Sequence, residues 1–160
     1  MKNKKVVLIA QAALIGAIYV VVTLLFAPFG FGGVQVRISE ALTILPFFTP
    51  AAIPGLFVGC LIANLLGGAI PVDIVFGSLA TLAGALGSYA LRKKMWLVPV
   101  PPIVANTLVV PLVLYYGYGE NLPIWLMRLT VGAGEVLSCG VLGMVLLFAL
   151  RRYENRIFGS

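Results

Sequence analysis

Long runs of apolar residues, separated by short polar, glycine or proline breaks, dominate the pattern of this chain. Four of these runs are long enough for a membrane-spanning helix of about 20 residues, and they cover approximately residues 6–26, 72–91, 99–116 and 124–150. A further apolar stretch, residues 38–66, contains Pro46, Pro50 and Pro54. Because proline kinks or ends a helix, this stretch forms either one distorted span or two short ones.

The positions of the basic residues decide between these two arrangements. Lysine and arginine occur in three clusters, at Lys2–Lys5, Arg92–Lys94 and Arg151–Arg156. The positive-inside rule places all three on the cytoplasmic side, so an even number of spans must separate each cluster from the next. Two segments in the proline-containing stretch, at about 38–48 and 51–66, satisfy this rule. We therefore predict an all-α integral membrane protein, a single domain of residues 1–160 folded as a six-transmembrane-helix bundle with both termini cytoplasmic.

Composition excludes several classes of protein. With 61% hydrophobic residues, 10% charged residues and a mean hydropathy of +1.10, the chain lies outside the range of soluble globular domains. The net charge of +6 comes from clusters beside apolar runs, which argues against nucleic-acid binding. The chain contains no histidine, which leaves Ser78 without an evident base for catalysis, and no G-x-x-x-x-G-K-[ST] loop. We therefore expect neither an enzyme nor a self-powered pump, and no cofactor or metal centre.

Two further features of the chain have more than one explanation. The lysines before residues 6–26 resemble the start of a secretory signal, but the apolar run is longer than usual and no clear A-x-A site follows, which favours a retained first helix. Cys60 and Cys139 lack the spacing of a metal site, so we expect two buried free thiols.

The six-span arrangement fixes the depth of each polar residue. Nearly all the costly groups fall in the outer half of the membrane or at its midplane, which predicts a polar pocket that opens outward and is sealed below. Acidic residues outnumber basic ones there, which suits a cationic or hydrogen-bond-rich small molecule. The candidates for ligand binding from this argument are Arg37, Glu40, Asn64, Asp73, Asn106, Arg128 and Glu135.

Most of these candidates also have an ordinary structural explanation. Arg37 and Glu40 can pair on one helix face, Asn64 and Asp73 can stabilise helix ends, and Asn106 can satisfy carbonyls freed by a nearby proline. Glu135 is harder to explain in this way, because a carboxylate in mid-membrane needs a partner. Arg128, seven residues earlier on the same helix face, is the partner that the spacing suggests.

Small residues recur at steps of four on the first predicted helix, at Ala13 and Ala17. Such a pattern allows another helix to approach closely in lipid. It indicates either ordinary packing within the bundle or a docking face for another protein.

Three motifs carry a resemblance to a known family. They are QVRISEAL at residues 35–42, GCLIAN at 59–64, and Asp73 followed by GSLATL at 77–82. Together they resemble the QueT-type queuosine-precursor transporters, which belong to the substrate-binding (S) components of energy-coupling-factor transporters. The likeness is densest from Gln35 to about Arg92 and looser elsewhere.

The resemblance implies a function, partners and a location. It implies a six-helix S component in the bacterial plasma membrane that captures a deazaguanine precursor of queuosine at the outer face. Its partners would be a transmembrane scaffold protein, which docks on Ala13 and Ala17, and two cytoplasmic ATPases. An S component for another vitamin or purine-like heterocycle, or a solitary facilitator, remains an alternative.

The resemblance also suggests roles for the candidate residues. Glu40 or Glu135 would pair with the ligand's cationic aminomethyl group, and Asn64, Asn106 or Asp73 would read its guanine-like edge. Trp125 or an outer tyrosine would stack on the ring.

Overall fold

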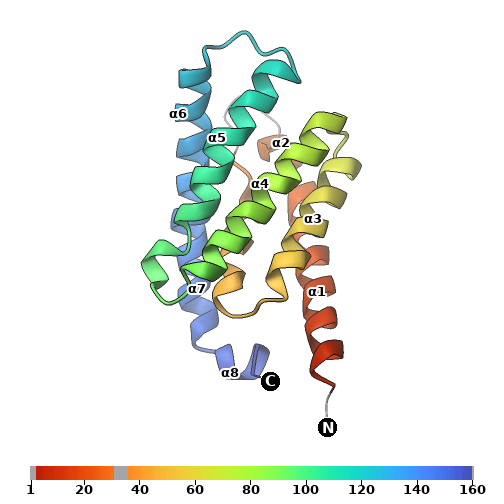
Figure 1. Cartoon of the computed structure of the whole chain (residues 1–160), viewed down its shortest axis with the longest axis vertical. Coiled ribbons are helices and arrows are strands. Elements are labelled where there is room, and N and C mark those ends of the chain that lie inside the picture. Colours follow the sequence, from red (N-terminus) through yellow and green to blue (C-terminus); the bar gives the residue numbers. More distant parts are fainter. Residues whose placement is uncertain (1–2, 31–35, 160) are drawn as a thin grey trace.

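The computed structural model describes residues 3–30 and 36–159, and every regular element within them is a helix (Figure 1). The prediction of an all-helical protein is therefore confirmed. Gln35, the first residue of the QVRISEAL motif, lies outside the described residues.

The helices follow the predicted order along the chain. The α-helices are α1 (Lys4–Leu25), α2 (Ala27–Gly30), α3 (Ala52–Leu66), α4 (Pro71–Ala90), α5 (Val100–Tyr116), α6 (Ile124–Glu135), α7 (Gly143–Arg151) and α8 (Glu154–Ile157). Three further helices have other geometries: the 3-10 helices η1 (Ile38–Phe47) and η2 (Met95–Leu97) and the π-helix η3 (Val136–Leu142). The long segments run up and down the bundle, and the N- and C-termini lie at the same end (Figure 1).

Length and composition mark four segments as candidate membrane spans. These are Lys4–Leu25, Pro71–Ala90, Met95–Tyr116 and the continuous rod Ile124–Arg151, which is made of α6, η3 and α7. The apolar helices η1 and α3 are shorter. Large apolar side chains such as Leu25, Tyr116 and Val145 are exposed on the outer surface, as expected of a protein that faces lipid. The protein is thus a membrane protein with several candidate spans.

The 3-10 geometry of η1 is the main departure from the expected helices. Its first and last turns are closed by i to i+3 bonds, from Glu40 N to Arg37 O and from Phe48 N to Leu45 O. Pro46 has no N–H to continue an α-helical ladder. A 3-10 helix rises about 2.0 Å per residue rather than 1.5 Å, so this short segment reaches further through the bundle than an α-helix of equal length.

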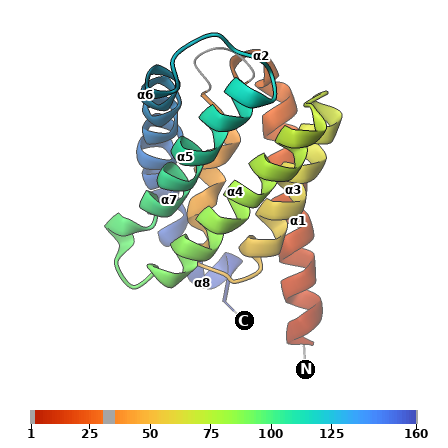
Figure 2. The same cartoon turned by 45° about the horizontal axis from the view of Figure 1, so that its top comes forward.

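The element η1 lies inside the bundle and packs against α1, α3, α4, α7 and η3. The helices α1 and α3 lie side by side in both views (Figures 1 and 2). Their glycines allow a close backbone approach: a Cβ on Gly55 would come 2.7 Å from the carbonyl oxygen of Ala12. The bundle therefore surrounds η1, which carries the first of the predicted ligand-binding carboxylates.

Candidate functional site

Glu40 is the centre of a cluster of polar side chains in the core. It lies in the first turn of η1 and is only 1% exposed. Its Oε1 accepts hydrogen bonds from the hydroxyl of Tyr19 on α1 and, at 3.5 Å, from Thr81 Oγ1 on α4. Its Oε2 accepts one from Asn106 Nδ2 on α5 at 3.3 Å. Three helices thus fix the orientation of one buried carboxylate.

A second carboxylate, Glu135, joins this group from the end of α6. Its Oε2 lies 3.2 Å from the Sγ of Cys139, and Asn106 also interacts with it. Cys139 Sγ in turn lies 3.5 Å from the backbone oxygen of Glu40. We refer to Tyr19, Glu40, Thr81, Asn106, Glu135 and Cys139 together as the Glu40 cluster.

The π-helix η3 places Cys139 within this cluster. Cys139 falls in the stretch where the helix widens from α to π geometry, four residues after Glu135. Such π-bulges are rare and occur frequently at functional sites. Both Cys139 and the neighbouring Ser138 are fully buried.

The Glu40 cluster has the chemistry of a cation site. One ligand atom each from Glu40, Glu135 and Cys139 lies within 4.8 Å of the others. Two carboxylates this close in an apolar interior repel each other unless a proton or a cation is shared between them. The three groups can therefore hold either a metal ion or an organic ammonium group.

A second set of polar contacts involves three other predicted residues. Arg37 Nη1 lies 3.9 Å from Cys60 Sγ, and Asn64 Nδ2 lies 3.7 Å from the same sulfur and 3.5 Å from the backbone oxygen of Asp73. The sulfur of Cys60 also lies 3.4 Å from Thr81 Oγ1, and this contact connects the set to the Glu40 cluster. The Oδ1 of Asn64 is buried and has no hydrogen-bond partner among the described residues, so it is an acceptor that a ligand N–H can use.

The side chain of Asp73 is held from the loop between α5 and α6. Its Oδ2 accepts a hydrogen bond of 2.9 Å from the Tyr118 hydroxyl. Partial burial raises the pKa of Tyr118, and the hydrogen bond to Asp73 raises it further. The contact ties this loop to the first turn of α4.

Trp125 and Arg128 occupy different surroundings from the other candidates. Both are exposed on the first turns of α6, with Trp125 64% exposed. Glu135, on the same helix, is buried and contacts Cys139 and Asn106. Glu135 thus contacts groups in the core, whereas Arg128, the partner that the spacing suggested, is exposed.

The two small residues predicted to form a docking face, Ala13 and Ala17, line an apolar groove between α1 and α3. The groove has a volume of about 700 Å³. We call it the α1–α3 groove; its lining is Ile9, Ala12, Ala13, Gly16, Ala17, Val20, Val21, Pro54, Gly55, Val58, Gly59 and Ile62. Every lining side chain is apolar, so the groove suits a hydrophobic surface rather than a polar ligand.

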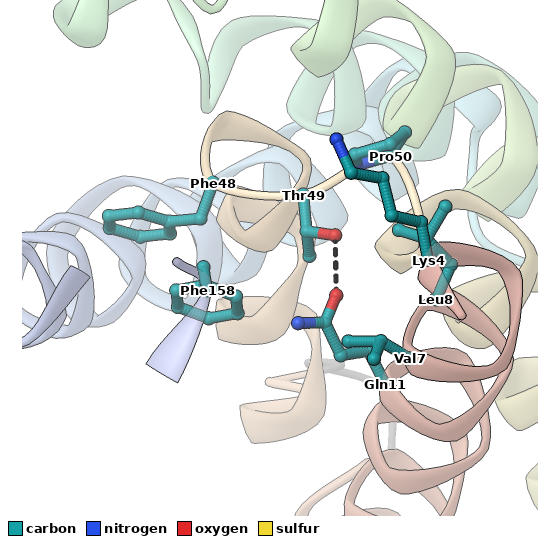
Figure 3. Close-up of a pocket in the computed structure, with 8 residues that line it drawn as sticks. All are labelled: Lys4, Val7, Leu8, Gln11, Phe48, Thr49, Pro50 and Phe158. Atoms are coloured by element: carbon teal, nitrogen blue, oxygen red, sulfur yellow. Dashed lines mark hydrogen bonds between the residues drawn. The ribbon is translucent and has the colours of Figure 1, made fainter. Parts of the chain in front are cut away.

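A smaller cavity, of about 130 Å³, lies at the end of the bundle that holds both termini (Figure 3). Thr49 Oγ1 donates a hydrogen bond of 2.9 Å to Gln11 Oε1 across it, and Phe48 stacks on Phe158 with ring centroids 5.0 Å apart. Lys4 is the charged residue in its lining. Because this lining contains Lys4 and no carboxylate, the cavity does not suit a cationic ligand.

Sequence reasoning missed several members of the Glu40 cluster. Tyr19 and Thr81 stand as single polar residues among apolar ones, and Cys139, like Cys60 outside the cluster, was expected only as a buried thiol. Both cysteines are indeed buried and free. The signal that was available is a polar side chain at mid-membrane depth, which in a hydrocarbon core needs a hydrogen-bond partner.

The fold and the Glu40 cluster define a polytopic helical membrane protein with ionisable groups gathered in its core, an arrangement typical of transport proteins. The chain belongs to the QueT transporter family, whose profile matches residues 9–152. The family is one of transporters and not of enzymes.

Among curated proteins, the chain is similar to the queuosine precursor transporter QueT of Lactococcus lactis subsp. cremoris (strain MG1363). The two are 34% identical over 84 residues, which cover 51% of this chain and 49% of the relative. The match thus spans about half the length of that relative. No solved structure matches the chain.

Proposed function

We propose that this protein is the substrate-binding (S) component of an energy-coupling-factor importer for a queuosine precursor. It crosses the bacterial plasma membrane six times with both termini cytoplasmic, and it captures a deazaguanine base at the outer face. Membership of the QueT transporter family and the similarity to a curated queuosine precursor transporter support the substrate class.

The observation that carries the proposal is the pair of buried carboxylates in the Glu40 cluster. Glu40 and Glu135 come from separate helices and, with Cys139, offer ligand atoms within 4.8 Å of one another. A ligand with an aminomethyl group carries an ammonium with three donors. Bound between the two carboxylates, it neutralises the charge that makes the pair costly inside a membrane.

The remaining predicted residues recognise the rest of the ligand. The unpartnered Oδ1 of Asn64 accepts an N–H of the guanine-like edge, and Asn106 and Asp73 supply further polar atoms nearby. Arg37, held at Cys60, balances the negative charge of the cluster. Trp125 and Arg128, exposed at the start of α6, form the entrance, where the indole stacks on the incoming base.

The α1–α3 groove is the surface on which the transmembrane scaffold protein docks. Its lining is apolar, and the small side chains of Ala13 and Ala17 allow a partner helix to approach closely. Two ATPases bound to the scaffold supply the energy that this chain cannot obtain itself.

An uptake experiment tests both parts of this proposal. Bacterial cells that cannot make the queuosine precursor are given this chain alone, the scaffold and ATPases alone, or all components together, and labelled precursor is counted. We expect uptake only with all components. Equal uptake by the chain alone would identify a facilitator, and no uptake of the precursor by a complete, membrane-inserted assembly would overturn the assigned substrate.

A further inference from the structure

Tyr19 touches both the Glu40 cluster and the α1–α3 groove. The side chain is 0% exposed, and its hydroxyl donates a hydrogen bond to Glu40 Oε1. At its other end, the Cβ of Tyr19 packs on α3: a Cβ added to Gly59 would lie 3.0 Å from it. Gly59 is part of the groove lining. One rigid aromatic side chain therefore connects a carboxylate in the core with the wall of an external groove.

The surroundings of Tyr19 leave little room for independent movement of α1 and α3. A Cβ on Gly59 would also meet the carbonyl oxygen of Gly16 at 2.9 Å, so the two backbones are already in contact. One turn after Tyr19, the Thr23 hydroxyl donates a hydrogen bond of 2.6 Å to Ser39 Oγ, next to Glu40. Because close-packed interfaces transmit displacements instead of absorbing them, a shift at Glu40 reaches α1.

Glu40 is the group that a cationic ligand would share with Tyr19. Its Oε1 already accepts two hydroxyls, from Tyr19 and Thr81, while Oε2 accepts Asn106. A carboxylate has about four acceptor positions. Three positions are occupied, so an ammonium that enters between Glu40 and Glu135 takes up the remaining one, and its attraction for the carboxylate acts against the bond from Tyr19.

We propose that Tyr19 is a positioning residue that couples occupation of Glu40 by a cationic ligand to the shape of the α1–α3 groove. This inference rests on the proposed function, since it takes the Glu40 cluster as the ligand site and the groove as the docking surface. By linkage, a ligand that alters docking is itself bound more or less tightly when the partner docks.

A single cysteine introduced into the groove reports on this coupling in the purified chain. Val58, which lines the groove and is 48% exposed, is replaced in the variant Val58→Cys, and the rate of its reaction with a maleimide is measured with and without aminomethyl-deazaguanine. Native Cys60 and Cys139 are fully buried, and the unsubstituted protein gives their background. Val145→Cys, 63% exposed on α7 away from the groove, is the matched control. Ligand binding is measured on the same samples.

We expect the ligand to change the rate at Val58→Cys about fivefold or more, in either direction, which is the low end of ordinary allosteric coupling, and to leave Val145→Cys unchanged. Tyr19→Phe, measured at a ligand concentration that saturates this variant, should lose the change. Thr81→Val, which removes the other hydroxyl from Glu40 Oε1, should retain the change when it is likewise measured at its own saturating ligand concentration. A purely structural Tyr19 would alter stability in all samples but not this ligand-dependent difference.

The possible outcomes separate the two claims. Binding without a rate change, or the same rate change in Tyr19→Phe, overturns the coupling and leaves the proposed function intact. Failure of folded, unsubstituted protein to bind the base overturns the proposed function and the coupling with it. If Tyr19→Phe does not fold, the maleimide reaction of Val58→Cys is measured with the neutral hydroxymethyl analogue of the ligand. A rate change with the ammonium ligand alone supports the coupling, and an equal change with both bound ligands contradicts it.

Discussion

The amide nitrogen of Asn106 lies 3.3 Å from Oε2 of Glu40, and this hydrogen bond joins α5 to η1 inside the bundle. Asn106 also interacts with Glu135, so it stands between the two buried carboxylates. It is 3% exposed. An amide here supplies a hydrogen-bond donor to acids that lie in the core of the bundle, away from water.

Asn106→Leu should therefore destabilise the protein. It leaves Glu40 Oε2 without this donor, and an unsatisfied buried polar group costs about 1–3 kcal/mol, more if charged. Thermal unfolding in detergent, followed by tryptophan fluorescence, measures the effect. Leu108→Val, an apolar substitution at a half-exposed position on the same helix, is a control for the helix itself. An unchanged melting temperature for Asn106→Leu would argue against a structural role for this bond.

Gly55→Ala should separate α1 from α3. The added Cβ would come 2.7 Å from the Ala12 carbonyl oxygen and 3.2 Å from the Ala12 Cα, and neither backbone atom can move aside locally. Overpacking of this kind typically costs about 1–3 kcal/mol. Gly140→Ala is the matched control, because its nearest contact would be an ordinary 3.7 Å to a valine methyl. Equal melting temperatures for the two variants would show that the close approach of α1 and α3 is not what stabilises the pair.

The Tyr118 contact with Asp73 gives a dependence on pH with a definite sign. The folded-state pKa of Tyr118 is raised above its ordinary value of 10.0, first by burial and then by the bond to Asp73. Its contribution to stability is therefore complete below the ordinary value and is lost as the pH rises through the folded-state pKa. Hydrogen exchange of amides in residues 117–123 should accelerate over this alkaline range. In Tyr118→Phe, the same amides should exchange faster at neutral pH, and the tyrosine-dependent part of the pH effect should be absent. Identical exchange profiles in the two proteins would contradict a stabilising role of the Tyr118–Asp73 hydrogen bond.

The groove residues should affect transport without affecting ligand binding. Replacing both Ala13 and Ala17 by phenylalanine fills the α1–α3 groove from exposed positions, so the fold should tolerate the change. Uptake with the scaffold and ATPases should fall on the order of tenfold or more, equivalent to about 1.4 kcal/mol of docking free energy. Leu14→Phe, on the same helix but outside the groove lining, should transport normally. Normal uptake by the double variant would exclude the groove as the docking surface.

The hydrophobic pattern and the charge clusters predicted the helical class and the order of the helices. They did so because the length and spacing of apolar runs follow directly from the transfer of helices into lipid. The same argument selected Glu40, Asn106 and Glu135, which lie on separate helices and which the structure brings together. It did not reveal the 3-10 geometry of η1 or the π geometry of η3. In a nearly uniform apolar run, a change in residues per turn leaves no trace in the pattern of polar positions.

Tyr19 shows a second limit of sequence reasoning. Its place on α1 was evident, but its role depends on which helix packs beside it, and that is fixed by glycine contacts at Gly16, Gly55 and Gly59. Small residues indicate that a close approach is possible without identifying the partner. For this reason Ala13 and Ala17 indicated either packing within the bundle or a docking face, while the groove itself and the link from α1 to Glu40 required the structure.

Calorimetric titration of the detergent-purified chain with aminomethyl-deazaguanine, with guanine as the control, tests the central claim most directly. We predict saturable one-to-one binding of the precursor. Glu135→Gln should bind it about tenfold to hundredfold more weakly, because this variant keeps the shape of the side chain but removes one of the two negative charges that face the ammonium. Guanine, which has no ammonium, should bind weakly and equally to both proteins. Undiminished binding by Glu135→Gln, or no binding by folded unsubstituted protein, would contradict the assignment of the Glu40 cluster as the site of a cationic queuosine precursor.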